Sequence, residues 1–166
     1  MATKKKVYFR GLNKVMKNLN EEIQKIENRS AKGLIHAAII PIRDSETKTP
    51  KVPVKYGNLR ASRFVVSTQG EERIPGQIKA SFEGKNAGTE MSRHAMIVSK
   101  SRNFIKTSKK PLVVLGYSAN YAAFVHETDK KVNWTRTGSG AKFLEAHLRS
   151  NSDEMIKTIK KYAKIK

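Results

Sequence analysis

Residues 52–62 read VPVKYGNLRAS: two β-forming valines around a proline, a Gly-Asn pair, and a lead into the apolar run Phe64-Val65-Val66. The polar segment 44–51 just before it is expected to end the longest helical pattern of the chain. Prolines at 50 and 53 push the residues before them into extended geometry. The stretch therefore predicts a hinge between a helix and the first strand.

The helical pattern upstream of this hinge is amphipathic. Apolar residues recur at spacings of three and four across 12–26 and again across 34–42, and charged residues fill the other side. Gly33 and Pro41 mark places where the helix can bend. We expect one long kinked helix, or two in series, preceded by a short strand at 7–9.

Downstream of the hinge, residues 63–67 and 77–82 have the composition of two strands joined through 70–76, which predicts an antiparallel hairpin. From residue 84 to residue 110 small and polar residues prevail and no regular pattern holds. The chain also lacks acidic residues from 91 through 126. We interpret 84–110 as an inserted basic loop or arm.

The remaining elements complete an α+β pattern. Residues 112–117 form a Val- and Leu-rich strand pattern, and 121–125 suit either a helical turn or an edge strand. An apolar stripe from 143 to 162 predicts a C-terminal helix. We expect a single α+β domain over 1–166, in which a long N-terminal helix and a C-terminal helix pack on a small, mainly antiparallel sheet of three to four strands.

Composition points to an anionic partner. The 166 residues carry 34 Lys and Arg against 14 Asp and Glu, a net charge of +20, which surrounds a compact fold with a positive field. Nucleic acid, an acidic protein surface or a membrane face would each be attracted by that field. The alternative is that the lysines only solvate the surface and have no partner. The absence of cysteine excludes disulfides and thiolate sites. No apolar run reaches the ~20 residues of a membrane helix, so we expect a cytoplasmic protein without a membrane partner.

Candidate catalytic, metal and cofactor motifs are incomplete. The run 137–142, TGSGAK, lacks the longer Gly-rich span and the hydroxyl residue after lysine that a phosphate loop requires. His126, Glu127 and Asp129 could offer metal ligands, but no spacing brings the other histidines to them. We therefore expect no catalytic residue, no metal and no cofactor, and class the chain as non-enzymatic.

Cations cluster around one aromatic ring in the segment predicted as an arm. They alternate with Phe104 as in single-strand binders, although one ring is a thin platform for stacked bases. A solvated loop kept soluble by its charge is an equal alternative. The candidate contacts with phosphate or an acidic partner are Lys100, Arg102, Lys106, Lys109 and Lys110.

Several short motifs follow one another in a definite order over most of the chain. They are Gly11-Leu12, Pro53-Val54, Gly57-Asn58-Leu59-Arg60 with Ser62, Tyr121-Ala122 with Val125 and Glu127, and Phe143-Leu144. This order resembles the head-to-tail joining, or tail-completion, proteins of tailed-bacteriophage necks. The chain departs from that pattern at Tyr56, where threonine is usual, and at Lys142, where proline is usual.

The resemblance implies a structural virion component rather than an enzyme. Copies of the chain, six or twelve of them, would form a ring in the neck between the DNA-filled head and the tail, with DNA passing through the lumen. Its partners would be itself, the adjacent head-completion or stopper protein on the portal side, the tail terminator or tail tube, and, without sequence specificity, genomic double-stranded DNA. It would be made in the host cytoplasm and end in the virion.

The resemblance also assigns roles within the hinge. Gly57 can adopt a positive φ where the chain reverses, Asn58 can brace the turn and Leu59 can anchor it to the core. The residues expected at a subunit or partner interface are Tyr56, Gly57, Asn58, Arg60 and Arg63. A small basic nucleic-acid-binding module is the alternative function, and a hydrolase using His126 and Glu127 is a remote third.

Overall fold

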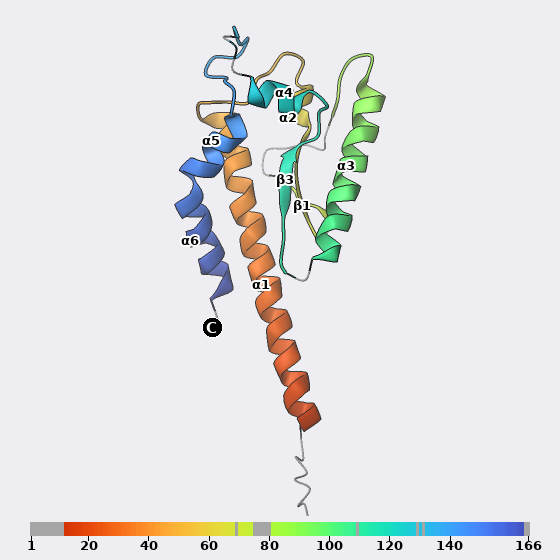
Figure 1. Cartoon of the computed structure of the whole chain (residues 1–166), viewed down its shortest axis with the longest axis vertical. Coiled ribbons are helices and arrows are strands. Elements are labelled where there is room, and N and C mark those ends of the chain that lie inside the picture. The colour runs from red at the N-terminus through yellow and green to blue at the C-terminus, as the bar shows by residue number, and fades with distance from the viewer. Residues whose placement is uncertain are drawn as a thin grey trace, which may run out of the picture.

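The computed structural model describes residues 12–68, 70–74, 81–108, 110–128, 130 and 132–164. The predicted α+β fold is confirmed: the chain has a long N-terminal helix, a helical C-terminal part and a three-stranded antiparallel sheet, and both terminal helical parts lie on the same side of the sheet (Figure 1). The strand predicted at 7–9 lies outside the described residues.

The N-terminal helix, α1 (Leu12–Thr47), is one continuous helix of 36 residues. It passes through Pro41 and ends at Thr47, within the polar segment 44–51 that was predicted to terminate it. Asp44, Ser45 and Glu46 of this last turn are polar, yet they are buried and paired. Ser45, for example, donates to the Ile42 carbonyl at 2.7 Å and also bonds the Tyr117 hydroxyl at 2.7 Å.

The sheet has the order β2-β1-β3, with β1 (Arg63–Ser67) in the centre, β2 (Gly70–Glu71) and β3 (Val114–Tyr117). Both pairs are antiparallel, with Ser67 opposite Gly70 and Val65 opposite Leu115. The predicted return strand at 77–82 is not formed at residues 81–82, and 77–80 lie outside the described residues. β2 lies in the segment 70–76, which was predicted to connect the two strands. Gly70 adopts φ +128°, which lets the chain return directly after β1.

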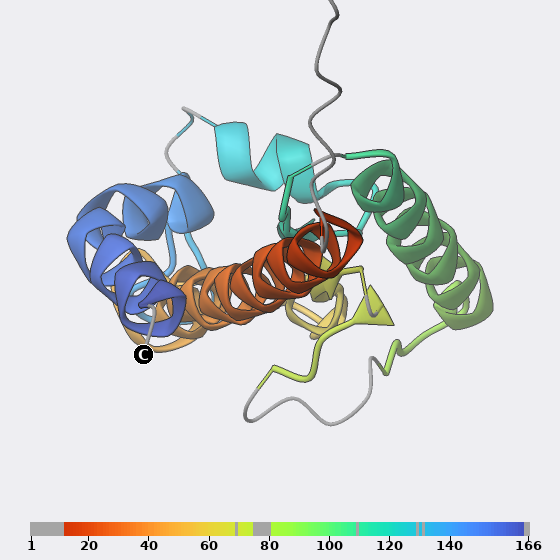
Figure 2. The same ribbon diagram turned by 90° about the horizontal axis from the view of Figure 1, so that it is seen from below.

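The segment predicted as a basic loop or arm is instead largely helical. Helix α3 (Ala87–Thr107) covers one face of the sheet, while α1 covers the other (Figure 2). The residues of α3 that face inward recur at helical spacing, but two of them, Glu90 and His94, are polar. A hydrophobicity pattern could not reveal this stripe because two of the three buried residues of α3 are polar.

Alternate residues of β1 serve the two faces of the sheet. Val65 packs with Ala38 and Ile42 of α1, whereas Phe64 and Val66 form a cluster with Ile105 of α3. All five residues of β1 are buried. The two-residue period of a strand thus places the core on both sides of one central strand.

The C-terminal part begins with α4 (Ala122–Glu127), which confirms the helical option for 121–125. The predicted C-terminal helix is two helices, α5 (Phe143–Ser150) and α6 (Ser152–Ala163), which pack against α1. The break falls at Asn151, whose buried side chain donates to the Asp44 carboxylate at 3.1 Å. This polar tie between α1 and the α5–α6 junction explains why the helix is interrupted.

Candidate functional site

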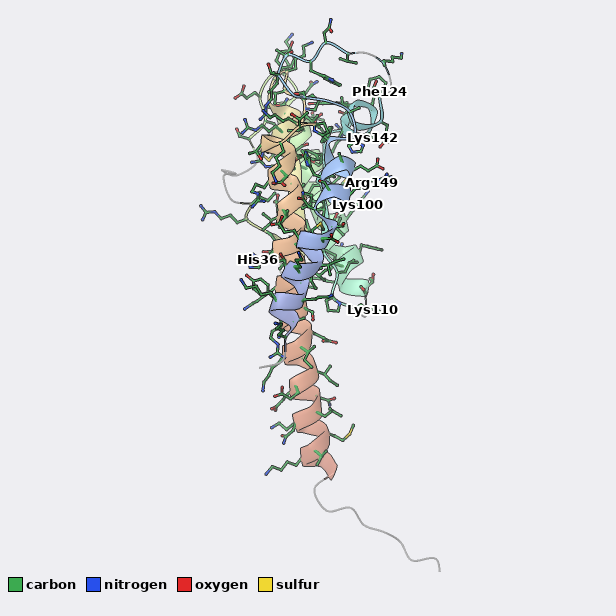
Figure 3. The ribbon with its side chains drawn as sticks, turned by 90° about the vertical axis from the view of Figure 1, so that its left-hand side faces the viewer. His36, Lys100, Lys110, Phe124, Lys142 and Arg149 are labelled. Atoms are coloured by element: carbon green, nitrogen blue, oxygen red, sulfur yellow. The ribbon has the colours of Figure 1, made fainter. Side chains whose placement is uncertain are left out.

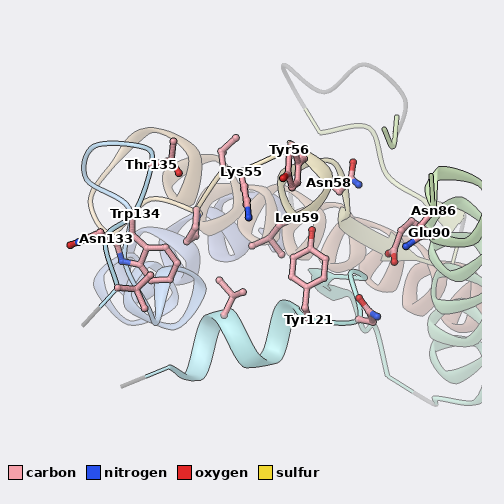
Figure 4. Close-up of a pocket in the computed structure, with 16 residues that line it drawn as sticks. Lys55, Tyr56, Asn58, Leu59, Asn86, Glu90, Tyr121, Asn133, Trp134 and Thr135 are labelled. Carbon is pink, nitrogen blue, oxygen red and sulfur yellow. The ribbon is translucent and has the colours of Figure 1, made fainter. Parts of the chain in front are cut away.

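A groove of about 610 Å³ lies at the end of the molecule where the hinge, α3 and α4 meet. Its walls come from residues 53–59, from the start of α3, from residues 120–125 and from the loop 132–135. Trp134 lies at one end of the groove and Asn86 and Glu90 at the other, with Tyr56 and Tyr121 between them (Figure 4). The groove thus unites four segments that are far apart in the sequence.

The hinge has the structure that its sequence predicts. Gly57 adopts φ +87° and precedes the one-turn helix α2 (Asn58–Ala61). The Asn58 side chain donates to the Glu83 carbonyl and accepts from the Glu83 N–H, both at 2.9 Å. Leu59 is buried in a cluster with Val52 and Phe143. The roles expected for Gly57, Asn58 and Leu59 are confirmed, except that Asn58 braces the turn against a distant segment.

The groove surface combines exposed aromatic rings with unbonded amides. The Tyr56 side chain is 72% exposed, and the Lys55 ammonium lies 5.2 Å from its ring centroid. The side chains of Asn86, Asn120 and Asn133 form no hydrogen bond within the described part of the chain. Aromatic rings provide contact area at a small entropic cost and asparagines provide adaptable hydrogen bonds, so this combination suits recognition of another polypeptide.

Glu90 closes one end of the groove as a buried carboxylate. It pairs with Arg93 at 2.9 Å within the same helix. Burial, together with the charge of Glu90, raises the pKa of Tyr121, and a backbone hydrogen bond from Leu59 opposes the shift only in part. The Tyr121 hydroxyl therefore remains a neutral hydrogen-bond donor over the physiological pH range.

Two of the predicted interface residues, Arg60 and Arg63, bind a carboxylate of their own chain. The Glu46 side chain accepts from Arg63 at 2.6 Å and lies 2.7 Å from the Arg60 guanidinium and 3.6 Å from that of Arg136. Arg63 is buried, so its role is internal, contrary to the expectation that it faces a neighbouring subunit. Arg60 remains half-exposed, and Tyr56 is the most exposed of the predicted set.

The predicted cationic contacts lie on α3 and just after it. Lys100, Arg102, Lys106 and Lys110 are exposed, and none forms an ion pair with a described residue. Figure 3 labels Lys100 and Lys110. Lys109 lies outside the described residues. Lys100 and Phe104 are four residues apart and share one flank of the helix, whereas Arg102 and Lys106 share another. The cations are therefore spread around the outer side of α3 and do not converge on one site.

Sequence reasoning missed a buried polar chain behind the groove. His94 Nδ1 bonds Ser118 Oγ at 2.8 Å, and His94 Nε2 bonds Glu71 Oε1 at 3.1 Å. The three residue types match a hydrolytic triad, but Ser118 and His94 are buried, and the rings of Phe64 and Phe82 pack on the imidazole. We interpret this row of hydrogen-bonded side chains as a structural link between α3 and the sheet. The sequence holds no local signal for this link, because His94 lies 24 residues from Ser118 and 23 residues from Glu71.

The other candidate constellations also stay local. His126 bonds Glu127 at 2.6 Å, and Lys142 pairs with the same carboxylate. Within the described residues no group of three or more His, Asp or Glu side chains is arranged to hold a metal ion. Among the same residues, no helix combines the length and the apolar character needed to cross a membrane.

Comparisons with protein-family models, with curated proteins and with solved structures found no match to the chain.

Proposed function

We propose that the chain is a structural component of the neck of a tailed-bacteriophage virion, where its copies form a ring that joins the head to the tail. One observation carries the proposal. The motifs that resemble the neck family are separated in the sequence, yet Leu59, Ala122, Val125 and the pair Phe143-Leu144 all belong to one hydrophobic cluster beneath the groove. Segments that share one cluster and one surface are expected to act as one unit.

Binding through the groove depends on complementary shape and hydrogen bonding and involves no catalysis. Rigid aromatic side chains and free amides characterise surfaces that recognise other polypeptides. A contact between unlike surfaces of successive copies closes into a ring when the rotation between neighbours is right. We therefore assign the groove, with Tyr56 at its rim, to the contact with a neighbouring copy or with an adjacent neck protein on the portal or tail side.

The excess positive charge supports docking and DNA passage in the same proposal. A field of this sign speeds association with acidic neighbouring rings. It also favours contact with genomic DNA without sequence preference, and such contact weakens steeply as the salt concentration rises. The unpaired cations of α3 are the described residues best placed for either role.

Deletion of the coding sequence from the phage genome that carries it tests the proposal. Filled heads and complete tails should accumulate separately in electron micrographs of the lysate, and a plasmid copy should restore joined particles. A plasmid copy with Tyr56→Ala and Trp134→Ala should restore few of them, whereas the matched control Phe104→Ala, an exposed aromatic outside the groove, should restore them fully. Normal joined particles without the chain would refute the function.

The outer face of α3 supports a second candidate, a small basic nucleic-acid-binding module. Its observation is that Lys100, Arg102 and Lys106 are exposed without acidic partners among the described residues. A DNA-binding titration at two salt concentrations, with a mass measurement in solution, separates the two candidates. Tight binding by a monomer at physiological salt favours the module, and weak binding together with ring formation favours the neck protein.

A further inference from the structure

The N-terminal half of α1 extends away from the rest of the structure (Figures 1 and 3). Every side chain from residue 14 to residue 25 is exposed, whereas farther along the helix Ala37 and Ile40 are buried. The exposed half nevertheless carries large apolar side chains, which are 44 to 62% exposed. We call these residues the α1 stripe: Val15, Met16, Leu19 and Ile23.

The α1 stripe is the free end of a continuous helix-packing seam. Residues at alternating spacings of three and four, which is the heptad pattern of helices packed side by side, run from Met16 through Leu19, Ile23 and Ile26 and continue at Ser30, Gly33, Ala37 and Ile40. The second half of this seam is filled by α6. At Gly33 an added Cβ would lie 3.1 Å from the Ile159 Cα, so the two helices are in close contact there.

An uncovered stripe of this kind is costly. Four large apolar side chains stay in water, and each would gain about 1.5–3 kcal/mol if fully buried. A short helical extension without tertiary contacts is also only marginally stable in water. Both costs are removed when another amphipathic helix covers the stripe.

Charge indicates which partner covers it. Residues 12–29 carry four cations against three carboxylates, a net charge of +1, whereas residues 30–166 carry +15. DNA or an acidic protein would be attracted to that strongly basic remainder. Two copies of the chain repel each other least where this nearly neutral, mixed-charge segment meets its counterpart.

We infer that the α1 stripe pairs with the α1 stripe of a second copy in an antiparallel arrangement. An antiparallel pair places the two strongly basic bodies at opposite ends of the paired helices, and it sets Leu19 against Ile23 and Met16 against Ile26 of the second copy. A parallel pair would bring the bodies together and place Glu22 beside the second copy's Glu27. This contact joins like surfaces, so it differs from the contact between unlike surfaces that closes a ring, and it holds whether or not the neck function does.

Analytical ultracentrifugation of the full chain at physiological salt tests the pairing. The unchanged chain should show a concentration-dependent dimer. Leu19→Ser with Ile23→Ser removes four apolar side chains per dimer and should raise the dissociation constant by about 100-fold or more. The matched control, Asn18→Ser with Gln24→Ser on the exposed polar side of the same helix, should leave the constant unchanged. Far-UV circular dichroism confirms that the fold outside the stripe is retained.

Disulfide trapping tests the orientation, and the absence of native cysteine makes it direct. In a mixture of Leu19→Cys and Ile23→Cys chains, the mixed disulfide should form faster than either symmetric one, and Asn18→Cys should not cross-link. Faster symmetric cross-linking would overturn the antiparallel arrangement. A chain that stays monomeric at all concentrations, or a dimer whose dissociation constant is unchanged in the Leu19→Ser, Ile23→Ser variant, would overturn the pairing. Loss of the dimer in that variant while rings still form would leave both the pairing and the proposed function standing, because the two contacts use different surfaces.

Discussion

Replacing Glu46 by glutamine should destabilise the fold more than any other single loss of charge in the described structure. Glu46 is the carboxylate on which Arg60, Arg63 and Arg136 converge, at 2.7, 2.6 and 3.6 Å. These arginines come from α2, from β1 and from the loop beside the groove, so one side chain of α1 ties three segments together. Glu46→Gln preserves the shape of the side chain and removes its charge.

The magnitude follows from the exposure of each partner. The Arg63 side chain is 7% exposed, and removing the charge of one partner from a buried ion pair costs about 3–5 kcal/mol because the buried guanidinium loses its carboxylate. Arg60 and Arg136 reach solvent, so water screens them and each adds about 0.5 kcal/mol at most. The expected loss of about 3–5 kcal/mol is a large part of the 5–15 kcal/mol that stabilises a typical domain.

Guanidinium denaturation at neutral pH, followed by circular dichroism, measures this loss. Glu21→Gln is the matched control, because Glu21 lies on the same helix and forms an exposed ion pair with Lys17 at 4.0 Å, so its removal should change stability by less than about 0.5 kcal/mol. Arg63→Ala should cost far more than Arg60→Ala. Equal losses of stability for Glu46→Gln and Glu21→Gln would refute the conclusion that Glu46 holds the three segments together.

Three further predictions concern the backbone and one buried acid. Gly57→Ala should lower the unfolding free energy by about 1–2 kcal/mol, measured from the denaturant midpoint. An added Cβ would meet no atom within 4 Å, so the loss comes from holding alanine at φ +87°. An unchanged midpoint would contradict this. Gly33→Ala should lower the melting temperature and speed amide exchange in α6. The added Cβ would lie 3.1 Å from atoms of Ile159 and Tyr162, and the overpacking cost of about 1–3 kcal/mol outweighs the gain of about 1 kcal/mol in helix propensity. A higher melting temperature would count against the close contact. Burial alone would raise the pKa of Asp44, but Lys48 and Arg43 outweigh it and hold the pKa below its ordinary value. The stability that this carboxylate contributes is therefore present at neutral pH and lost as the pH falls below about 4, and urea titrations should show a shallower acid loss for Asp44→Asn than for the unchanged chain.

The fold was predictable wherever burial followed apolar periodicity. The three- and four-residue spacing in α1 and the runs of β-branched residues in β1 and β3 carry that signal, and each element appears where it was expected. α3 was not predictable by this means, because its inward positions include Glu90 and His94, which are buried by pairing with Arg93, Ser118 and Glu71. A polar helix face can be buried when its side chains have hydrogen-bond or ion-pair partners, and a hydrophobicity pattern does not detect such a face.

The candidate site was predictable only in its local part. The Gly57-Asn58-Leu59 turn was found because backbone conformation and turn chemistry are properties of adjacent residues. The rest of the groove, with Trp134 at one end and Asn86 at the other, depends on how remote segments pack and leaves no local pattern. Arg63 was misassigned to an interface for a related reason: its partner Glu46 lies 17 residues away in the last turn of α1, and no local pattern joins the two residues.

Cryo-microscopy of the intact particle's neck, with a tag fused to the chain, tests the central claim most directly. The account predicts a closed ring of tagged copies between the portal and the tail, with the Tyr56 groove of each copy seated against a neighbouring protein. Particles that carry no such density at the vertex between capsid and tail, or that carry the tag only elsewhere in the virion, would contradict it.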